Sequence, residues 1–462
     1  MDFVRTCFGT PVPRVLAWEA SSDNPVGSEY IIMEKCPGND LSELMDEAAR
    51  SDKVVSGLAK LQRDLASIKF SQFGSLYYKE DVDEELQARP LYAPGIPEDE
   101  CSQRFRIGPS VERLFYRGGH AGLRIDRGPC TFIQFLGFSR CLIQDFSGYD
   151  VRSYVEAAAK SEVEWIRAFS DSPSALIQDG AHHPADYHLH RLQQWLRLIP
   201  AVLPTQSELC APVLNHPDLS GGNVMLFVQN EEPMISGIID WQGATVRPLF
   251  DVSVPRFLDA TPDDLYNLKS NHGSSSSADG AEEPATFLVD SLGQLALAHR
   301  YIHTLSAFNS TLCDVMCSSH LGLLRDTKHC SCHSWSDGLP IFEDHMMSFC
   351  DMYGGEVPAH PDYPTCPISF DESERSRQAT DYEVHHKEAM LENLCRRYLI
   401  ARGILLQPDG GIAVNDFENA QRHVAKVYEI GTRKLSEEEK RKIEAAWPFR
   451  QGKFSLLLDS CL

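Results

Sequence analysis

Three residues whose types suit phosphoryl transfer lie close together near the middle of the chain. Asp218 is followed by Asn223, and two apolar stretches separated by a polar turn then lead to Asp240. In such a set, one carboxylate can orient an attacking hydroxyl group and accept its proton. An amide oxygen and a second carboxylate can hold magnesium against nucleotide phosphates. We therefore expect Asp218 to be the base, and Asn223 and Asp240 to bind the metal.

The spacing around Asp218 adds weight to this interpretation. Residues 216–223 read His-Pro-Asp-Leu-Ser-Gly-Gly-Asn, the H-x-D-x4-N spacing of a kinase catalytic loop. Each residue alone also has an ordinary structural interpretation: a core histidine, a turn former, or a cap at the start of a strand. Their joint position before a strand, a turn and a second strand favours the catalytic interpretation.

The wider pattern resembles a known family. The catalytic-loop sequence and the run Ile-Ile-Asp-Trp-Gln at 238–242 are similar to the fungal aminoglycoside phosphotransferase and choline kinase-like family. In that family an Asp after apolar residues, often followed by Trp, replaces the Asp-Phe-Gly triplet of protein kinases. The branch named after altered inheritance of mitochondria protein nine also matches, so the resemblance covers nearly the whole chain; the further matching segments are 11–17, 29–34, 105–109 and 447–450.

This resemblance implies a protein-kinase-like α+β fold, with ATP and Mg as cofactors and a small-molecule hydroxyl group as substrate. It implies that the ring of His216 supports the catalytic loop. It also implies that the strand at 30–33 leads into a segment that binds adenine through its backbone, with Met33, Glu34 and Cys36 as the cofactor-binding residues. A plain strand that ends in a Pro-Gly turn is the alternative there.

The start of the chain departs from the family pattern. Kinase-like folds begin with a small lobe that carries a glycine-rich phosphate loop and a strand lysine, and neither occurs before Pro11. The expected organisation is a small-lobe remnant and hinge at 1–41 and a large, mainly helical lobe at 42–462. Two interpretations stay open. One is an active transferase whose start is truncated, which we favour because the metal ligands are present; the other is an inactive, pseudokinase-like protein with a binding or mitochondrial-maintenance role.

Several segments of the expected large lobe have a recognisable character. Apolar spacing predicts helices at 51–70, 154–169 and 187–198. The remaining assignments are an irregular insertion at 81–140, catalytic and metal loops at 213–242, a flexible polar loop at 271–284 and a helical C-terminal subdomain at 285–450.

Composition limits the possible partners and locations. The 462 residues include 66 acidic and 43 basic side chains, for a net charge of −23. This charge argues against binding to nucleic acid or to an anionic membrane surface. No apolar run reaches the length of a transmembrane helix, and the first residues do not resemble a signal peptide. We expect an intracellular protein, mitochondrial by family resemblance, or cytoplasmic if the chain truly starts at Met1.

Fourteen cysteines are dispersed without the spacing of a compact disulfide framework, which indicates a reducing compartment. One stretch is dense enough in cysteine and histidine to suggest zinc. Its helical spacing equally suits buried apolar thiols, which is the interpretation we favour. The residues concerned are Cys313, Cys317, His320, His329, Cys330, Cys332 and His333.

Overall fold

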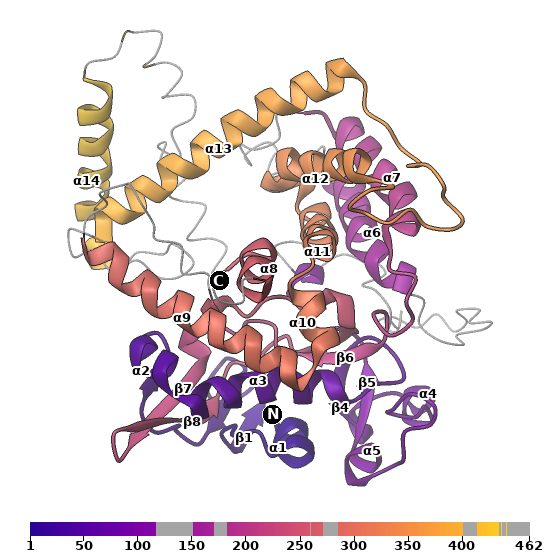
Figure 1. The fold of residues 1–462 in the computed structure, drawn as a ribbon, viewed down its shortest axis with the longest axis vertical. Helices are drawn as coiled ribbons and strands as arrows, with labels where there is room; N and C mark the ends of the chain where they lie inside the picture. The colour runs from indigo at the N-terminus through magenta and orange to yellow at the C-terminus, as the bar shows by residue number, and fades with distance from the viewer. Residues whose placement is uncertain are drawn as a thin grey trace. The chain divides into compact units, whose positions relative to one another are not determined.

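The computed structural model describes residues 1–116, 151–170, 183–258, 260–270, 285–400 and 414–433, together with Ser436 and Lys440. The chain divides into two compact units (Figure 1). The first consists of Met1–Ser336 with Phe349–Ile368, and the second of Asp337–Ser348 with Ser369–Leu462. The candidate site lies wholly within the first unit. The boundary expected at residue 41 stays a prediction.

The named strands of the described residues all lie in the first unit and form four small antiparallel sheets. One sheet has three strands in the order β3-β7-β8, and the others are two-stranded. The pairs are β1 (Val15–Glu19) with β2 (Tyr30–Met33), β4 (Ser75–Tyr78) with β5 (Phe105–Gly108), and β6 (Pro212–Asn215) with β9 (Thr245–Pro248); the three-stranded sheet contains β3 (Asn39–Asp40), β7 (Val224–Gln229) and β8 (Glu232–Ile238).

The β7–β8 hairpin turns at two residues with positive φ, Asn230 at 53° and Glu231 at 65°. A two-residue turn of this kind matches the right-handed twist of the strands it joins. The polar turn expected between the two apolar stretches is short, since β8 already begins at Glu232. Pro233, which lacks an amide hydrogen, is accommodated because β8 is an edge strand of its sheet.

Helices are the commonest elements of the described residues, and they make up the named elements of the C-terminal half of the chain. Their bounds are α1 (Asp2–Phe8), α2 (Met45–Arg50), α3 (Asp52–Ser67), α4 (Glu84–Gln87), α5 (Glu100–Arg104), α6 (Val151–Phe169), α7 (Ala185–Val202), α8 (Pro262–Ser270), α9 (Ala285–Phe308), α10 (Ser310–Met316), α11 (Ser319–Ser331), α12 (Leu339–Met352), α13 (Glu372–Ile400) and α14 (Val414–Thr432). The expected α+β class with a mainly helical C-terminal half is therefore observed. None of the described helices has both the length and the apolar character needed to cross a bilayer.

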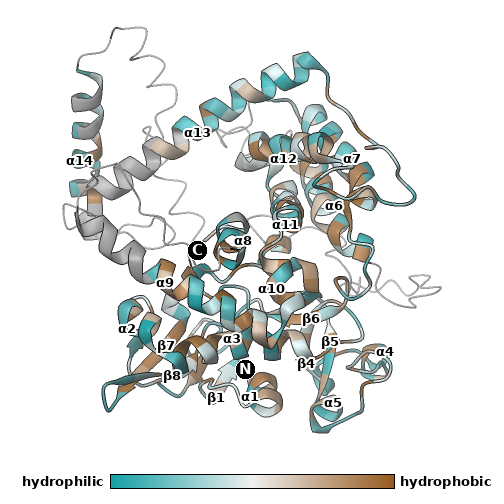
Figure 2. Ribbon diagram, viewed as in Figure 1, coloured by the Kyte–Doolittle hydropathy of each residue, from teal (hydrophilic) through white to brown (hydrophobic). Residues whose placement is uncertain are grey.

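Helix α3 shows how the sequence builds the core of the first unit. Ser51 caps it by accepting a hydrogen bond from the Val54 amide. Its buried side chains recur every three or four residues, so they form one apolar face. That face packs against α9, whose Leu297, Tyr301 and Leu305 are fully buried (Figure 1). In the second unit, by contrast, the described side chains of α13 are mostly hydrophilic (Figure 2).

The first helix packs on elements of the expected large lobe. The ring of Phe3 lies 5.7 Å from that of Phe70 and 5.5 Å from that of Phe105. A disulfide joins Cys7 to Cys101 in the same region. This single disulfide does not form a compact disulfide framework. The intracellular location stays a prediction.

Strand β4, which follows α3, pairs with β5 from the expected irregular insertion at 81–140. Part of the irregular insertion is therefore ordered, since β5, α4 and α5 lie within it. Residues 117–140 of that insertion and the loop at 271–284 lie outside the described residues.

Candidate active site

Two antiparallel pairings bring the predicted site residues together. Strand β6 pairs with β9 so that Asn215 faces Thr245, and the loop after β6 therefore emerges beside the loop before β9. In the β7–β8 hairpin, Val224 faces Ile238. Asn223 and Asp240 consequently lie at the same end of that hairpin. The four predicted residues 216, 218, 223 and 240 thus meet where these loops adjoin.

His216 connects the two loops through both ring nitrogens. Its Nδ1 accepts a hydrogen bond of 3.3 Å from the Asp218 amide, so the ring proton resides on Nε2, which lies 2.9 Å from the Ile239 carbonyl oxygen. The ring is buried and lies edge-on to Trp241 at 4.6 Å between centroids. Burial lowers the pKa of His216, which favours this neutral tautomer. These contacts link the ring to both loops, and the part that His216 plays in catalysis stays a prediction.

Asn223 closes a circuit of hydrogen bonds. Its side-chain nitrogen donates to the Asp218 carbonyl oxygen at 2.8 Å, and its own carbonyl accepts from the Ile239 amide at 3.0 Å. With His216, these bonds join Asp218, Asn223 and Ile239 into one ring. Because the amide nitrogen is engaged, the side-chain oxygen is the atom that Asn223 can offer to a cation.

Asp240 has a backbone conformation that non-glycine residues rarely adopt. Its φ is 55°, in the left-handed region. Such a conformation costs free energy and persists only where the surroundings enforce it. Trp241 contributes to that enforcement, since it is buried and donates from Nε1 to the Ile238 carbonyl at 3.0 Å. The buried indole packs against His216 rather than into solvent.

Asp218 also has a partner that the sequence pattern did not reveal. Its Oδ1 lies 3.4 Å from Nη1 of Arg256, whose side chain is 75% exposed. Arg256 begins a short 3-10 turn. The backbone amide of the next residue, Phe257, donates a hydrogen bond of 3.3 Å to the Leu219 carbonyl and so connects this turn to the catalytic loop. A positive charge therefore lies beside the proposed base. Its 38-residue separation from Asp218 gave no local signal.

The predicted nucleotide-binding segment runs along the same hairpin. Met33 ends β2 with its side chain exposed, and Cys36 lies against Gly237 of β8. Glu34 has structural contacts instead: its amide donates to the Arg14 carbonyl at 2.9 Å, and its carboxylate lies 3.2 Å from the Arg14 guanidinium. The Glu34 amide is therefore not available to an adenine ring in this arrangement.

Close backbone contact fixes this segment to the hairpin. Gly38 has a φ of 93°, and a Cβ added there would lie 1.9 Å from the Leu226 carbonyl oxygen. A hydrogen bond of 2.7 Å from the Ser236 hydroxyl to the Pro37 carbonyl adds to the contact. The predicted nucleotide segment and the predicted metal ligands are thus carried by one small sheet.

A cavity of about 350 Å³ adjoins the metal loop. Trp241 and Gly243 line it on the loop side, and aromatic side chains, including Trp18, Tyr77 and Phe105, line it elsewhere. The cavity therefore combines an apolar wall with a position next to the candidate metal ligands.

Below the site, a buried cluster of charges secures the end of β9. Asp251 accepts hydrogen bonds from Tyr154 at 2.7 Å and from Lys328 at 2.6 Å, and Arg247 lies 3.6 Å away. Burial alone would raise the pKa of Asp251, but the charges of Lys328 and Arg247 lower it. Glu112 completes the cluster through Arg247 at 3.1 Å. Asp251 is therefore a structural hydrogen-bond acceptor.

A known protein family matches the segment that contains these site residues. Residues 143–263 match the phosphotransferase enzyme family, and this segment contains all four site residues of the catalytic and metal loops. That family implies a protein-kinase-like fold, which is consistent with the α+β, mostly helical architecture. The resemblance to the fungal aminoglycoside phosphotransferase-like family is therefore confirmed, whereas the absence of most of the small lobe stays a prediction.

The particular relatives are fungal. Two proteins described as subtelomeric hrmA-associated cluster proteins, from two strains of Aspergillus fumigatus, are each 28% identical over 97% of this chain and 87% of their own. Altered inheritance of mitochondria protein 9 from Candida dubliniensis is 27% identical over 59% of this chain and 43% of its own. The protein of that name from Lodderomyces elongisporus is 24% identical over 84% and 62%, respectively. No solved structure matches the chain.

Proposed function

We propose that this protein is an ATP- and Mg-dependent phosphotransferase that acts on a hydroxyl group of a small molecule. The observation that supports this proposal is the ring of hydrogen bonds through His216, Asp218, Asn223 and Ile239. It fixes the backbone of Asp218, the side-chain amide of Asn223 and the residue before Asp240. Catalysis in this class consists mainly of such positioning and of electrostatic stabilisation.

Each side chain has a distinct role in this proposal. Asp218 orients the substrate hydroxyl and accepts its proton. The side-chain oxygens of Asn223 and Asp240 bind Mg²⁺, and both are the hard oxygen donors that this ion prefers. When bound, the metal neutralises charge on the nucleotide phosphates. Arg256 supplies a further positive charge beside the base.

The acceptor and the location are also part of the proposal. The cavity beside the metal loop has a size and an aromatic wall that suit a small organic acceptor. The acidic chain, with a net charge of −23, favours a neutral or cationic acceptor over nucleic acid or a membrane surface. Relatives named as mitochondrial support a mitochondrial location, with the cytoplasm as the alternative.

A catalytically inactive kinase-fold protein is the second candidate, and ion pairing near the start of the chain favours it. Arg5 is paired with Asp2, and Arg14 is paired with Glu34. These two arginines are therefore not positioned to hold the outer phosphates of a nucleotide. In this case the chain would act through binding, for example in mitochondrial maintenance.

The decisive experiment compares Asp240→Asn and Asp218→Asn with the wild-type chain. Asparagine tolerates the left-handed backbone of Asp240, so that variant removes a charge without added strain. We expect Asp240→Asn to weaken Mg-dependent ATP binding by at least ~10-fold, measured by calorimetric titration with and without a chelator. Asp218→Asn should bind MgATP normally but lower turnover by roughly 10²–10⁴-fold, measured as ADP release over a panel of small alcohols.

The possible outcomes separate the two candidates. Turnover that disappears in Asp218→Asn supports the transferase. Nucleotide binding without turnover on any alcohol of the panel favours the inactive protein. Binding of MgATP that is unchanged by Asp240→Asn would refute the metal assignment.

A further inference from the structure

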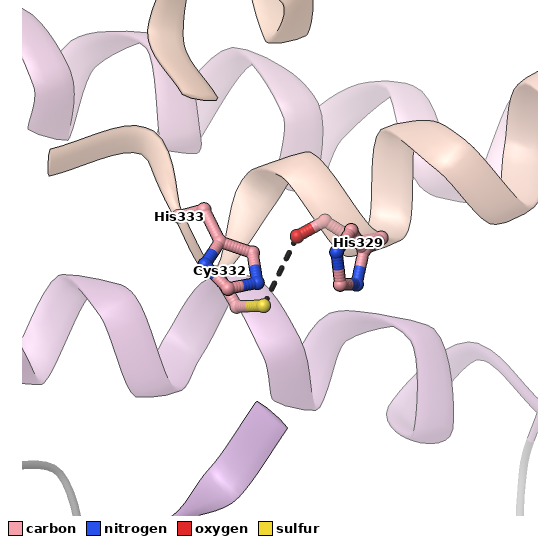
Figure 3. A group of neighbouring side chains, drawn as sticks. All are labelled: His329, Cys332 and His333. Carbon is pink, nitrogen blue, oxygen red and sulfur yellow. Dashed lines mark hydrogen bonds between the residues drawn. The ribbon is translucent and has the colours of Figure 1, made fainter. Parts of the chain in front are cut away.

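A compact group of potential metal ligands closes the C-terminal end of α11, away from the residues assigned to phosphoryl transfer. It consists of His329, Cys332 and His333 (Figure 3). One ring nitrogen from each histidine and the Cys332 sulfur all lie within 4.8 Å of one another. The ring centroids of the two histidines are 4.5 Å apart.

Local backbone geometry explains why these three side chains converge. Residues three and four positions apart lie on the same face of a helix. The helix ends here in tight turns, in which the Cys332 amide donates to the His329 carbonyl at 3.2 Å and the His333 amide donates to the Cys330 carbonyl at 3.0 Å. The Cys332 thiol also donates to the His329 carbonyl, at 3.0 Å. The turn therefore directs all three side chains to one place.

The three potential ligands differ in their exposure to solvent. Cys332 is 4% exposed and packs with Leu114, Phe115, Ala157 and Ala158. His329 is exposed, and His333 is intermediate. A metal bound here would have an apolar floor and would remain accessible from solvent.

The Nδ1 atom of His333 gives an independent indication of an absent ligand. It is buried and has no hydrogen-bond partner within the described part of the chain. A buried polar atom without a partner is uncommon in folded proteins and calls for an explanation, such as an ion.

We propose that His329, Cys332 and His333 form a zinc site with two imidazole nitrogens and one thiolate as ligands. Zinc binds such nitrogens at about 2.0–2.1 Å and thiolates at about 2.3 Å, which places tetrahedral ligands roughly 3.3–3.6 Å apart. The ligand atoms now lie within 4.8 Å of one another, so zinc binding requires them to approach to that spacing. Binding releases the thiol proton of Cys332, and its bond to the His329 carbonyl gives way to the bond with the metal. The fourth position is left to water or to a small exogenous ligand.

The other candidates in this cysteine- and histidine-rich stretch have different partners. Cys313 and Cys317 form a hydrogen bond with each other, and Cys313 also contacts the Ile302 carbonyl at 3.8 Å. His320 lies 3.1 Å from the Ser318 hydroxyl. Of the seven residues that the sequence grouped together, the proposed site uses three.

The site has a defined structural consequence. Lys328, which binds Asp251 in the buried charge cluster, immediately precedes His329 on α11. A metal that fixes the last turn of α11 would therefore stabilise the helix that holds the end of β9. The site is independent of the ligands proposed for magnesium.

The test measures zinc in the purified full chain after zinc loading and exhaustive dialysis. We expect about one zinc per chain by elemental analysis, as in other three-ligand sites. His329→Ala, Cys332→Ser and His333→Ala should each weaken zinc binding by at least ~10-fold in competition with a chromophoric chelator. Cys330→Ser is the matched control, because it removes a neighbouring thiol outside the group, and it should keep the metal.

Cobalt substitution provides a second readout that reports the ligand type. The wild-type chain and Cys330→Ser should show a thiolate-to-cobalt charge-transfer band, which Cys332→Ser should lack. Asp240→Asn should keep zinc, which separates this site from the proposed magnesium site. Cys332 is buried, so Cys332→Ser is informative only if the variant folds. His329→Ala changes an exposed residue, and its zinc affinity tests the proposal if Cys332→Ser does not fold. Absence of zinc from the wild-type chain, or zinc binding unchanged in His329→Ala, would overturn the proposal.

Discussion

Arg256 lies 3.4 Å from the carboxylate of Asp218, and the arginine side chain is 75% exposed while that of Asp218 is 28% exposed. An ion pair this open to water adds little to stability, because solvent screens the charges and the long side chain loses freedom. We therefore expect the ion pair to affect catalysis at the candidate active site rather than the stability of the fold. Within the described part of the chain, the pair places the guanidinium of Arg256 beside the proposed base.

We predict that Arg256→Ala lowers kcat/KM for ATP by about 10-fold or more, because a positive charge near the transferring phosphoryl group stabilises its transition state. The free energy of unfolding should change by less than about 0.5 kcal/mol. ADP-release kinetics and urea denaturation measure the two quantities. Arg167→Ala, which opens an exposed pair with Glu164, is the control and should alter neither. Equal kinetics in Arg256→Ala and wild type would contradict a role at the site.

Two buried histidines should make stability depend on pH. Burial lowers the pKa of His188 to about 4, and it also lowers the pKa of His216. In the unfolded chain both take up a proton near pH 6.5. Below that pH the unfolded state binds more protons than the native state, so the free energy of unfolding falls as pH decreases from about 6.5 towards 4. Above pH 6.5 these groups have no effect.

The expected contribution of His188 is about 3 kcal/mol once the pH reaches 4, because its pKa is about 4 in the native state and near 6.5 in the unfolded chain. Urea denaturation between pH 7 and pH 5 would measure its onset. Carboxylates titrate in the same range, so the comparison is with His188→Gln, which cannot be protonated. That variant should lose less stability between pH 7 and pH 5 than the wild-type chain does. Identical losses would show that His188 is protonated in the native state.

The buried charge cluster should be sensitive to the loss of one partner. Lys328→Met leaves the Asp251 carboxylate without its 2.6 Å partner in a site that is 3% exposed. Removing one member of a buried pair typically costs about 3–5 kcal/mol, because the remaining charge is uncompensated. Urea denaturation would measure this loss. Lys53→Met removes a partner of Glu232 at the surface and should cost less than about 1 kcal/mol. Similar effects of the two substitutions would contradict the structural role of the cluster.

The candidate site residues were predicted mainly from their spacing over a short stretch of the sequence. Asp218, Asn223 and Asp240 lie within one strand-turn-strand segment, so their meeting follows from the pairing of adjacent strands. Apolar periodicity likewise placed α3, α6 and α7 to within a few residues of their bounds. In each case the structure depends on interactions between residues that are close together in the sequence.

Contacts between distant segments could not be predicted in this way. Lys328 and Tyr154 reach Asp251 across 77 and 97 residues, respectively, and no spacing rule connects them. Nothing in the sequence near Gly74 indicates that strand β4 pairs with Phe105–Gly108. Arg256 resembles any surface arginine until the fold places it beside Asp218.

The contact between Gly38 and β7 gives a prediction that links stability to nucleotide binding. A Cβ in Gly38→Ala would lie 1.9 Å from the Leu226 carbonyl oxygen, and the φ of 93° is unfavourable for alanine. Strain of about 1–2 kcal/mol adds to an overpacking cost of about 1–3 kcal/mol. The segment must move away from the hairpin that joins Asn223 to Asp240, so MgATP binding should weaken together with stability.

Gly27→Ala separates strain from crowding. Gly27 also has a positive φ, 76°, but nothing lies within 4 Å of an added Cβ. It should therefore lose only the strain of about 1–2 kcal/mol and keep nucleotide binding. Denaturation and calorimetric titration of both variants measure these differences. If Gly38→Ala resembled Gly27→Ala in both measurements, the close approach of the 36–40 segment to β7 would not be required. The nucleotide segment and the metal ligands would then act independently of each other.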